Sequence, residues 1–328
     1  MTVLVTGGAG YIGCHTVRAL RALDRPVVVL DSLETGSEDA LLGAPLVVGD
    51  IADTDLVARV VIEHGVDSII HFAGYKNAGE SMQKPAKYFR NNVVGTARLL
   101  EALEGSAVRR FVFSGSCSVY GTPAELPVSE AAPLQPESPY GQSKLMSEQM
   151  LRWYGEVTGL RWMSLRYFNA SGASADAVIG EDFSVTLNLV PLVMKAALGL
   201  RPPVQVFGTD FPTPDGTAIR DYIHVEDLAD AHVLALEQLE AGGASAAVNL
   251  GTGTGSSVKQ VIEAAEREIG RPVPAEYVGR RPGDPSEVWA DNRLAAERLG
   301  WKPRYGLDEI VASAWRWHSS HPNGYRST

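Results

Sequence analysis

The 328-residue chain lacks the features that mark membrane, secreted and nucleic-acid-binding proteins. No apolar stretch reaches about 18 residues, so no membrane-spanning helix is expected. There are only two cysteines, Cys14 and Cys117, which favours free thiols in a reducing compartment over a disulfide framework. The first residues already read as a strand and leave no room for a signal peptide, so we expect a cytoplasmic protein.

Basic residues are also fewer than acidic residues, 29 against 39. The net charge is −10 and no basic run occurs, which argues against nucleic acid as a partner but not against a phosphorylated small molecule. The seven histidines show no metal-ligand spacing, so no metal site is predicted. Charged residues make up 21% and hydrophobic residues 45% of the chain, as is typical of a globular protein with its own core.

Glycine is present where a phosphate-binding turn needs it. The short apolar strand that begins at Val3 runs into glycines 7, 10 and 13, and an apolar-periodic helix follows. Glycines let the backbone approach a pyrophosphate, whose charge then lies at the N-terminus of the helix. The spacing is G-x-x-G-x-x-G, a variant of the usual dinucleotide fingerprint, and the alternative is a glycine-rich turn without a ligand.

An acidic residue follows at the distance that this fingerprint requires. A second apolar strand ends at Asp31, 18 residues after Gly13, where a carboxylate that binds the adenosine ribose is expected. A carboxylate there would repel a 2′-phosphate. The cofactor predicted from these residues is therefore NAD rather than NADP.

Tyr140 and Lys144 form the second chemical signal. Four residues apart on a helix, they project from the same face, and an ammonium beside a phenol favours the phenolate. We therefore expect a lowered pKa for Tyr140, which would make it a general base for a sugar or alcohol hydroxyl. Ser116, 24 residues earlier, is placed to hold the same hydroxyl. Alone, such a pair is a weak signal, because solvated helix faces often carry one.

The first half of the chain alternates short apolar runs with helical patterns, which predicts a doubly wound parallel α/β (Rossmann) sheet. The predicted strands are Thr2–Thr6, Pro26–Leu30, Leu46–Val48, Ser68–Phe72, Phe111–Ser114 and Trp162–Arg166. The predicted helices are Ile12–Leu23, Thr54–His64, Pro85–Leu103 and Tyr140–Glu156. Asp50, Ala73 and Ser116 all follow strands, so they are expected at the edge of the sheet where such folds bind ligands.

The pattern changes after Arg166. Residues 168–222 are richer in Gly, Pro and Asn, with one clear helix at Leu187–Leu198, and regular elements then return. We predict helices at Val225–Leu239, Val258–Ile269, Asn292–Leu299 and Leu307–Ser319, and a strand at Ala247–Leu250. The predicted domains are a NAD-binding Rossmann domain over residues 1–170, to which a segment at about 223–250 returns, and a smaller mixed α/β substrate-binding lobe over 171–328.

Several blocks resemble the extended short-chain dehydrogenase/reductase family, and within it the UDP-hexose 4-epimerases. The resemblance covers the whole chain, and its more specific blocks are His71–Lys76, Arg220–Val225 and Trp289–Asp291. It implies an NAD-dependent isomerase that acts on UDP-sugars. Tyr140 would take the 4-hydroxyl proton while hydride passes to tightly held NAD⁺, and hydride would return to the opposite face of the 4-keto sugar.

The resemblance also implies roles for individual residues. The expected catalytic residues are Ser116, Tyr140 and Lys144. Those expected at the cofactor are Gly7, Gly10, Tyr11, Ile12, Gly13, Asp31, Ser32, Asp50, Ile51, Phe72, Ala73, Lys76, Asn91, Ser114, Tyr140, Lys144 and Phe168. Those expected at the UDP-sugar are Ser116, Tyr140, Asn169, Asn188, Phe207, Arg220, Tyr222, Arg281, Asp284 and Val288.

Two positions depart from the family pattern. Gly115 stands where these epimerases often have another serine. Val288 stands where epimerases restricted to plain hexoses tend to carry a bulky aromatic residue, and a smaller side chain leaves room for a 2-acetamido group. UDP-GlcNAc and UDP-GalNAc are therefore further candidate substrates.

Two other function classes stay open. A nucleotide-sugar 4,6-dehydratase would share the fold, NAD and the Tyr–Lys pair, but it would need an Asp–Glu pair where this chain has Cys117 and Ser118. A non-catalytic NAD-binding module would not need Ser116, Tyr140 and Lys144. The resemblance further implies a homodimer built through the helices Pro85–Leu103 and Tyr140–Glu156.

Overall fold

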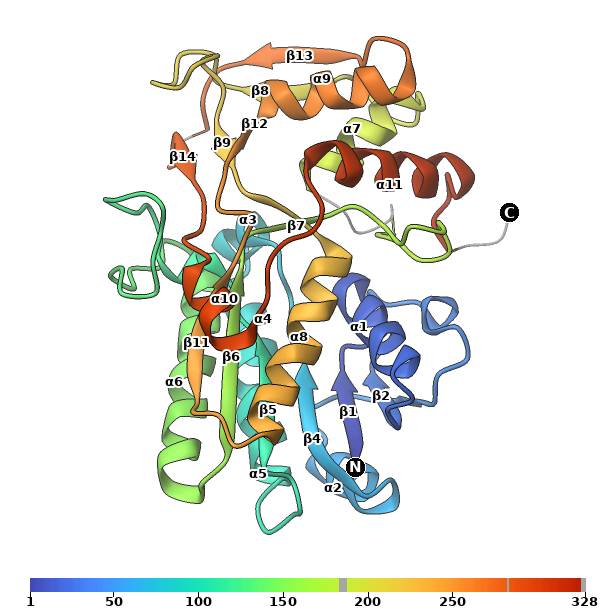
Figure 1. Ribbon diagram of the computed structural model, residues 1–328, viewed down its shortest axis with the longest axis vertical. Coiled ribbons are helices and arrows are strands. Elements are labelled where there is room, and N and C mark those ends of the chain that lie inside the picture. The colour runs from blue at the N-terminus through green and yellow to red at the C-terminus, as the bar shows by residue number, and fades with distance from the viewer. Residues whose placement is uncertain (183–187, 282, 326–328) are drawn as a thin grey trace.

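The computed structural model describes residues 1–182, 188–281 and 283–325. Its centre is a seven-stranded sheet with the order β11-β6-β5-β4-β1-β2-β3, in which all neighbouring strands run parallel (Figure 1). The strands are β1 (Thr2–Thr6), β2 (Val27–Asp31), β3 (Leu46–Val48), β4 (Val66–His71), β5 (Arg110–Ser114), β6 (Arg161–Tyr167) and β11 (Ala246–Leu250). The predicted doubly wound α/β fold is confirmed.

The alternation of side chains along each strand builds a core on both faces of the sheet. In β1, Val3 and Val5 pack into one core, whereas Leu4 packs into the other. Helices α1 (Tyr11–Ala22) and α8 (Val225–Glu240) cover the first face, toward the viewer in Figure 1. Helices α2 (Thr54–Glu63), α5 (Gly95–Ala102) and α6 (Pro139–Thr158) cover the second.

The strand order creates the place where a ligand can enter. From β1 the chain adds β2 and β3 on one side, and it then crosses to the other side with β4. The loops after β1 and β4 therefore leave the sheet toward opposite faces, and a crevice opens between them at the carboxyl ends of the strands. The glycine turn lies at this point, directly after β1.

A smaller lobe packs over these strand ends around its own apolar core (Figure 1). Helices α7 (Leu189–Ala197), α9 (Val258–Ile269) and α11 (Leu307–Ser320) surround the parallel pair of β8 (Val204–Phe207) and β13 (Ala275–Val278). Further short elements are β7 (Asn169–Ser171), β9 (Ile219–Arg220), β10 (Tyr222–His224), β12 (Ser256–Ser257), β14 (Glu287–Val288) and α10 (Arg293–Leu299).

One predicted helix differs in kind from the elements of the structure. The helix predicted over Pro85–Leu103 is three consecutive pieces, α4 (Pro85–Tyr88), a π-helix (Phe89–Val94) and α5, and the unpredicted α3 (Ala78–Gln83) precedes them. Such π-helical turns recur at functional sites, and Asn91 and Asn92 lie in this one. Leu187, the predicted first residue of the α7 helix, lies outside the described residues.

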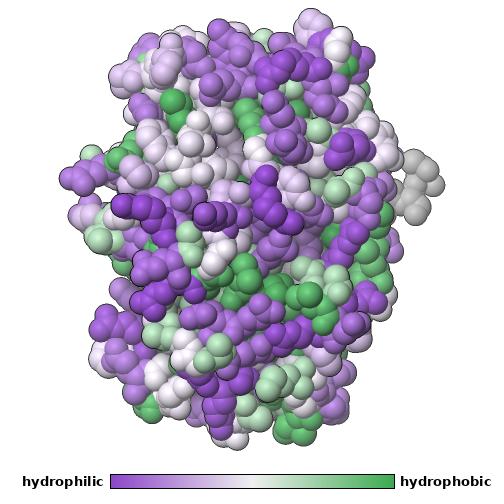
Figure 2. All heavy atoms as spheres, in the orientation of Figure 1, coloured by the Kyte–Doolittle hydropathy of each residue, from purple (hydrophilic) through white to green (hydrophobic). Residues whose placement is uncertain are grey.

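The visible surface is mostly polar. Figure 2 shows a face on which hydrophilic residues predominate and hydrophobic residues gather mainly below the middle. Across the described ranges, no helix combines the length and apolar character needed to cross a membrane.

Candidate functional site

A cavity of about 410 Å³ opens at the carboxyl ends of β1, β2 and β4 and is lined by the glycine turn. Gly7 has a φ of +71°, and a Cβ there would collide with the backbone of Ala73. A Cβ on Gly13 would collide with the carbonyl oxygen of Gly7. Two of the three fingerprint glycines are thus required by close backbone packing, which brings the start of α1 against the cavity.

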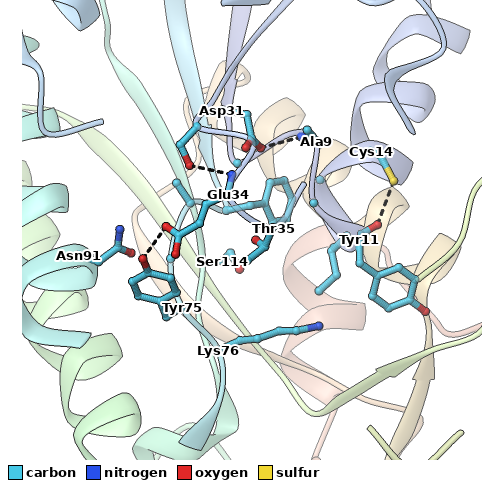
Figure 3. Close-up of a pocket in the computed structure, with 18 of the residues that line it drawn as sticks. Ala9, Tyr11, Cys14, Asp31, Glu34, Thr35, Tyr75, Lys76, Asn91 and Ser114 are labelled. Atoms are coloured by element: carbon cyan, nitrogen blue, oxygen red, sulfur yellow. Dashed lines mark hydrogen bonds between the residues drawn. The ribbon is translucent and has the colours of Figure 1, made fainter. Parts of the chain in front are cut away.

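Asp31 ties the turn to the end of β2. Its Oδ2 accepts a hydrogen bond from the Ala9 backbone N–H at 2.9 Å (Figure 3). Its Oδ1 accepts one from Leu33 N–H at 2.9 Å. Burial raises the pKa of the carboxyl group, and the two N–H groups oppose that shift. The carboxylate lines the cavity, as the fingerprint predicts.

Other features of the cavity wall fit a dinucleotide. The N-cap residue of α1 is Gly10, which has no side chain that could cap the first backbone N–H groups of the helix. This helix end can therefore receive a phosphate. The buried Oδ1 of Asn91, on the opposite wall, has no hydrogen-bond partner among the residues that the structure describes. A buried carbonyl oxygen without a partner is costly, and a ligand hydroxyl or amide would satisfy it.

The start of α6 positions the Tyr–Lys pair. Ser138 is the N-cap and accepts a hydrogen bond from Gly141 N–H at 3.1 Å, and Pro139 occupies the first helical position. Tyr140 and Lys144 then point from the first turns of α6 into the same cavity. Both side chains are buried, with exposed fractions of 8% and 5%.

The ionisation of this pair differs from the expectation. Burial raises the pKa of Tyr140 well above its ordinary value, and a hydrogen bond with Ser116 only partly opposes the shift. Burial lowers the pKa of Lys144 to about 8. The prediction that Tyr140 has a lowered pKa is therefore wrong for the protein on its own, because the loss of hydration outweighs the hydrogen bond with Ser116.

Lys144 is held by the end of β5. Its Nζ donates to the carbonyl oxygen of Ser114 at 2.9 Å. The Ser114 hydroxyl in turn pairs with the hydroxyl of Tyr167 at 2.6 Å, at the end of β6. Three strand or helix ends thus fix the ammonium group relative to the cavity.

Most of the predicted cofactor residues are brought together here. Those that line the cavity are Gly7, Gly10, Tyr11, Ile12, Gly13, Asp31, Ser32, Asp50, Ile51, Phe72, Ala73, Lys76, Asn91, Ser114, Tyr140 and Lys144. Phe168 is not among the residues that line it. It is 6% exposed and packs with Val119, Tyr120 and Leu145 in a separate apolar cluster.

The residues predicted to bind a UDP-sugar lie mainly in the smaller lobe. Arg220 forms an ion pair with Asp284, and its guanidinium also donates to the carbonyl oxygen of Pro285 at 2.8 Å. The Arg281 guanidinium lies over the ring of Phe207, 3.6 Å from its centroid. Two cations, a carboxylate and an aromatic ring therefore gather at the ends of β8, β9 and β14, a set suited to a nucleoside diphosphate.

An apolar cluster is contacted both by Val288 of β14 and by Cys117, the neighbour of Ser116 in the sequence. Val288 pairs with Arg220 in the parallel β14–β9 ladder and packs against the cluster that contains Phe168 and Cys117. The Arg220 charge acts on the Cys117 thiol, next to Ser116. The pKa of Cys117 is nevertheless raised to about 12 by burial, so this side chain remains a thiol.

Three further residues predicted at the UDP-sugar are Asn169 on β7, Tyr222 on β10 and Asn188 before α7. The Asn169 backbone N–H donates to the carbonyl oxygen of Asp221 at 2.9 Å, which anchors β7 beside β10. Tyr222 follows on β10 and is 6% exposed. Asn188 is the N-cap residue of α7, and its side chain turns toward Glu181.

Glu181 was not identified from the sequence. Its carboxylate is 3% exposed, lines the cavity, pairs with Lys76 Nζ at 2.9 Å and accepts from Asn188 Nδ2 at 3.2 Å. The backbone is also fixed, because Trp317 Nε1 donates to the carbonyl oxygen of Glu181 at 3.0 Å. No motif or periodicity marks an acid in this irregular segment.

Known proteins resemble the whole chain. Residues 3–251 match the family described as the NAD dependent epimerase/dehydratase family. The UDP-glucose 4-epimerase of Streptococcus mutans is 47% identical over 99% of this chain and 99% of its own length. The crystal structure of UDP-glucose 4-epimerase from Brucella ovis in complex with NAD has a TM-score of 0.94 at 45% identity, covering 96% of this chain and 97% of that one. The Bifidobacterium longum UDP-glucose 4-epimerase, in complex with NAD⁺ and UDP, has a TM-score of 0.94 at 41% identity and covers 99% of this chain and 100% of that one.

Proposed function

The chain belongs to the NAD dependent epimerase/dehydratase family, and we propose that it catalyses the reversible 4-epimerisation of UDP-galactose and UDP-glucose with tightly held NAD. The observation that carries this proposal is the convergence of Ser116, Tyr140 and Lys144 beside a cavity whose turn and acidic residue fit a dinucleotide. The family membership and the two NAD-bound neighbours support the same cofactor.

The chain's own residues then perform the proton chemistry. Bound NAD supplies a hydride acceptor, and later a hydride donor, for sugar carbon 4, together with a positive charge that favours the Tyr140 phenolate. Tyr140 would remove the proton of the 4-hydroxyl group and later return it to the oxygen of the 4-keto group, when hydride is added to the opposite face of carbon 4. Ser116 holds the same oxygen by a hydrogen bond, and the Lys144 ammonium stabilises the phenolate.

The cationic set in the smaller lobe holds the nucleotide while the sugar turns. Arg220 and Arg281 lie where they can pair with the diphosphate, Phe207 can border the base, and Asp284 can accept from the ribose. A substrate held at its diphosphate can swing the 4-keto sugar about that link, so that the other face of carbon 4 would be turned toward the cofactor. The net reaction is redox-neutral, so retention of the cofactor is an advantage.

Substrate breadth is set by Val288 in this proposal. The side chain is half-buried beside the Phe168 cluster, and we propose that it leaves room for the 2-acetamido group of UDP-GlcNAc and UDP-GalNAc. Val288→Tyr should reduce interconversion of the acetamido sugars about ten- to a hundredfold through overpacking, while turnover of UDP-galactose by the same variant serves as the control. Full acetamido activity in this variant would remove the role of Val288.

A homodimer is part of the proposal. Trp153 and Val157 lie one turn apart on α6 and are 65% and 80% exposed, and Val94 on the adjoining π-helix is 52% exposed. Exposed apolar side chains on these two helices suit packing against the same helices of a second copy. Sedimentation of the purified protein should show a dimer that Trp153→Glu converts to a monomer; a monomeric unaltered protein at micromolar concentration would contradict it.

The deciding experiment follows the sugar directly. Purified protein is incubated with UDP-galactose without added NAD, and UDP-glucose is followed by proton NMR. Equilibration of the two sugars would support both the epimerase and the retained cofactor. A 4-keto-6-deoxy product would instead support a dehydratase, although Cys117 and Ser118 provide no acid/base pair for that reaction. No reaction even with added NAD would overturn the proposal.

A further inference from the structure

A side-chain hydrogen bond crosses the dinucleotide groove. The Tyr75 hydroxyl donates to Glu34 Oε2 at 2.6 Å, and both residues line the cavity (Figure 3). Glu34 lies in the loop after β2, and Tyr75 lies in the loop after β4. Because β1 stands between β2 and β4 in the sheet, the glycine turn that follows β1 lies between these two loops. The hydrogen bond therefore joins the two walls that flank the turn.

The Tyr75 side of this bridge is firmly anchored. Asn92 Oδ1 accepts from the Tyr75 backbone N–H at 2.9 Å, and Asn92 Nδ2 donates to the Tyr75 carbonyl oxygen at 3.0 Å. Lys87 Nζ lies 3.9 Å from the centroid of the Tyr75 ring, a cation–π contact. Burial, followed by the hydrogen bond to Glu34, raises the pKa of Tyr75 to about 12, so the hydroxyl remains a donor.

The Glu34 side chain can move away from Tyr75, because it is exposed. The backbone nearby is fixed, since Asp31 accepts from Leu33 N–H at 2.9 Å, but the Glu34 side chain is exposed. Because this side chain is exposed, the charge-assisted hydrogen bond to Tyr75 is the contact that holds it across the groove. Such a contact can break and re-form without any change in the fold.

We propose that Glu34 and Tyr75 form a clasp over the dinucleotide groove that slows the release of bound NAD. The inference rests on the proposed function, because a catalyst that returns its hydride within each cycle needs a cofactor that stays in place. It adds to that function a retention element made of two side chains that take no part in the proton transfer.

The test measures cofactor exchange rather than activity. Holoprotein is mixed with excess isotopically labelled NAD, and the fraction of original cofactor still bound is followed by mass spectrometry after rapid desalting. Tyr75→Phe and Glu34→Gln should each accelerate exchange about three- to tenfold, as expected for loss of one partly exposed hydrogen bond to a charged group. The double variant should exchange no faster than the quicker single variant, because both remove the same bond.

A matched control exists outside the groove. The Tyr154 hydroxyl lies 3.5 Å from Glu104 Oε1 on the surface, so Tyr154→Phe removes a hydroxyl beside a glutamate that does not line the cavity. It should exchange NAD at the unaltered rate. If Tyr75→Phe and Glu34→Gln also exchange NAD at the unaltered rate, the proposal of a clasp is wrong and the proposed function stands. A purified protein that neither contains nor binds NAD would overturn the clasp and the proposed function together.

Discussion

Tyr140 and Lys144 lie one helical turn apart in α6, but different neighbours control them. The Tyr140 backbone N–H donates to Ser81 Oγ at 3.2 Å, while the Lys144 ammonium donates to the carbonyl oxygen of Ser114 at 2.9 Å. The spacing in the sequence predicts their common direction but not these partners. Burial then decides the ionisation, which explains why Tyr140 is a phenol in the protein on its own.

Tyr140→Phe tests the assigned base. The variant keeps the ring and loses the proton carrier, so turnover of UDP-galactose should fall about 10²- to 10⁴-fold. Cofactor content should stay near that of the unaltered protein, because Asp31 and the glycine turn are intact. NMR turnover and quantification of released NAD give the two readouts. Unchanged turnover would support a non-catalytic binding module, and loss of NAD would show that the ring position had moved.

Glu181 belongs to no sequence motif, but its contacts connect the two predicted binding sites. It places a buried negative charge between Lys76, expected at the cofactor, and Asn188, expected at the substrate. A carboxylate with 3% exposure is stable there only with such partners. We therefore expect it to position both side chains.

Glu181→Gln keeps the shape and removes the charge. Both the affinity for NAD and the affinity for UDP, measured by calorimetry, should fall about three- to thirtyfold, because Lys76 and Asn188 lose the partner that orients them. Glu263→Gln is the control, since Glu263 forms an exposed pair with Lys259 at 3.8 Å on α9. A loss of thermal stability with both affinities unchanged would reduce Glu181 to a structural role.

At the scale of elements, the β1–α1 turn shows how local sequence builds a binding surface. Strand β1 ends at Thr6, the chain turns through Gly7 at positive φ, and α1 begins at Tyr11. The close approach of Gly7 to Ala73 also packs the turn against the loop after β4. One residue without a side chain thus serves both the turn and its contact with the neighbouring loop.

Gly7→Ala should disturb both the turn after β1 and its packing against the loop after β4. The added methyl group meets backbone atoms that cannot move aside, so we expect the melting temperature to fall by several degrees and bound NAD to be lost. Gly65→Ala is the matched control, because Gly65 also has a positive φ, +61°, but, its two chain neighbours aside, no described residue has an atom within 4 Å of the place that its added methyl group would take. It should cost only about 1 kcal/mol of backbone strain and leave NAD in place. Equal effects of the two changes would show that strain alone, not the close approach, matters.

At the scale of the whole molecule, burial of histidine links the fold to pH. Five of the seven histidines, His15, His71, His224, His232 and His318, are buried, and burial lowers each pKa to about 3 or 4. They come from α1, β4, β10, α8 and α11, so they sample both lobes. Their neutral state is a property of the assembled core.

Stability should therefore fall as the pH decreases below about 6.5. Between about pH 4 and 6.5 the unfolded chain binds protons on these rings and the folded protein does not, so the free energy of unfolding rises with pH across this window. At pH 5.5, relative to 7.5, each ring should cost roughly 1 kcal/mol. Urea unfolding at the two pH values measures the sum. His64→Gln, at an exposed site, should keep the same dependence, and a pH-independent midpoint would contradict the assignment.

Part of the molecule can be predicted from the sequence because its signals are local. The strands at Thr2–Thr6 and Leu46–Val48 have the predicted bounds, and the parallel α/β class follows from their alternation with helices. The glycine turn and Asp31 meet because a fixed number of residues separates them along one strand–helix–strand unit. Short-range backbone geometry determines such features, so they can be predicted from the spacing of residues along the sequence.

Other features exist only in the tertiary structure. The short strands β8 and β13 pair across about 70 residues, Glu181 reaches Lys76 across 105, and the Glu34–Tyr75 clasp depends on which strands flank β1. The ionisation of Tyr140 likewise depends on how completely the surrounding elements exclude water. Contacts between distant segments and the degree of burial arise from packing of the whole chain, and no local spacing encodes them.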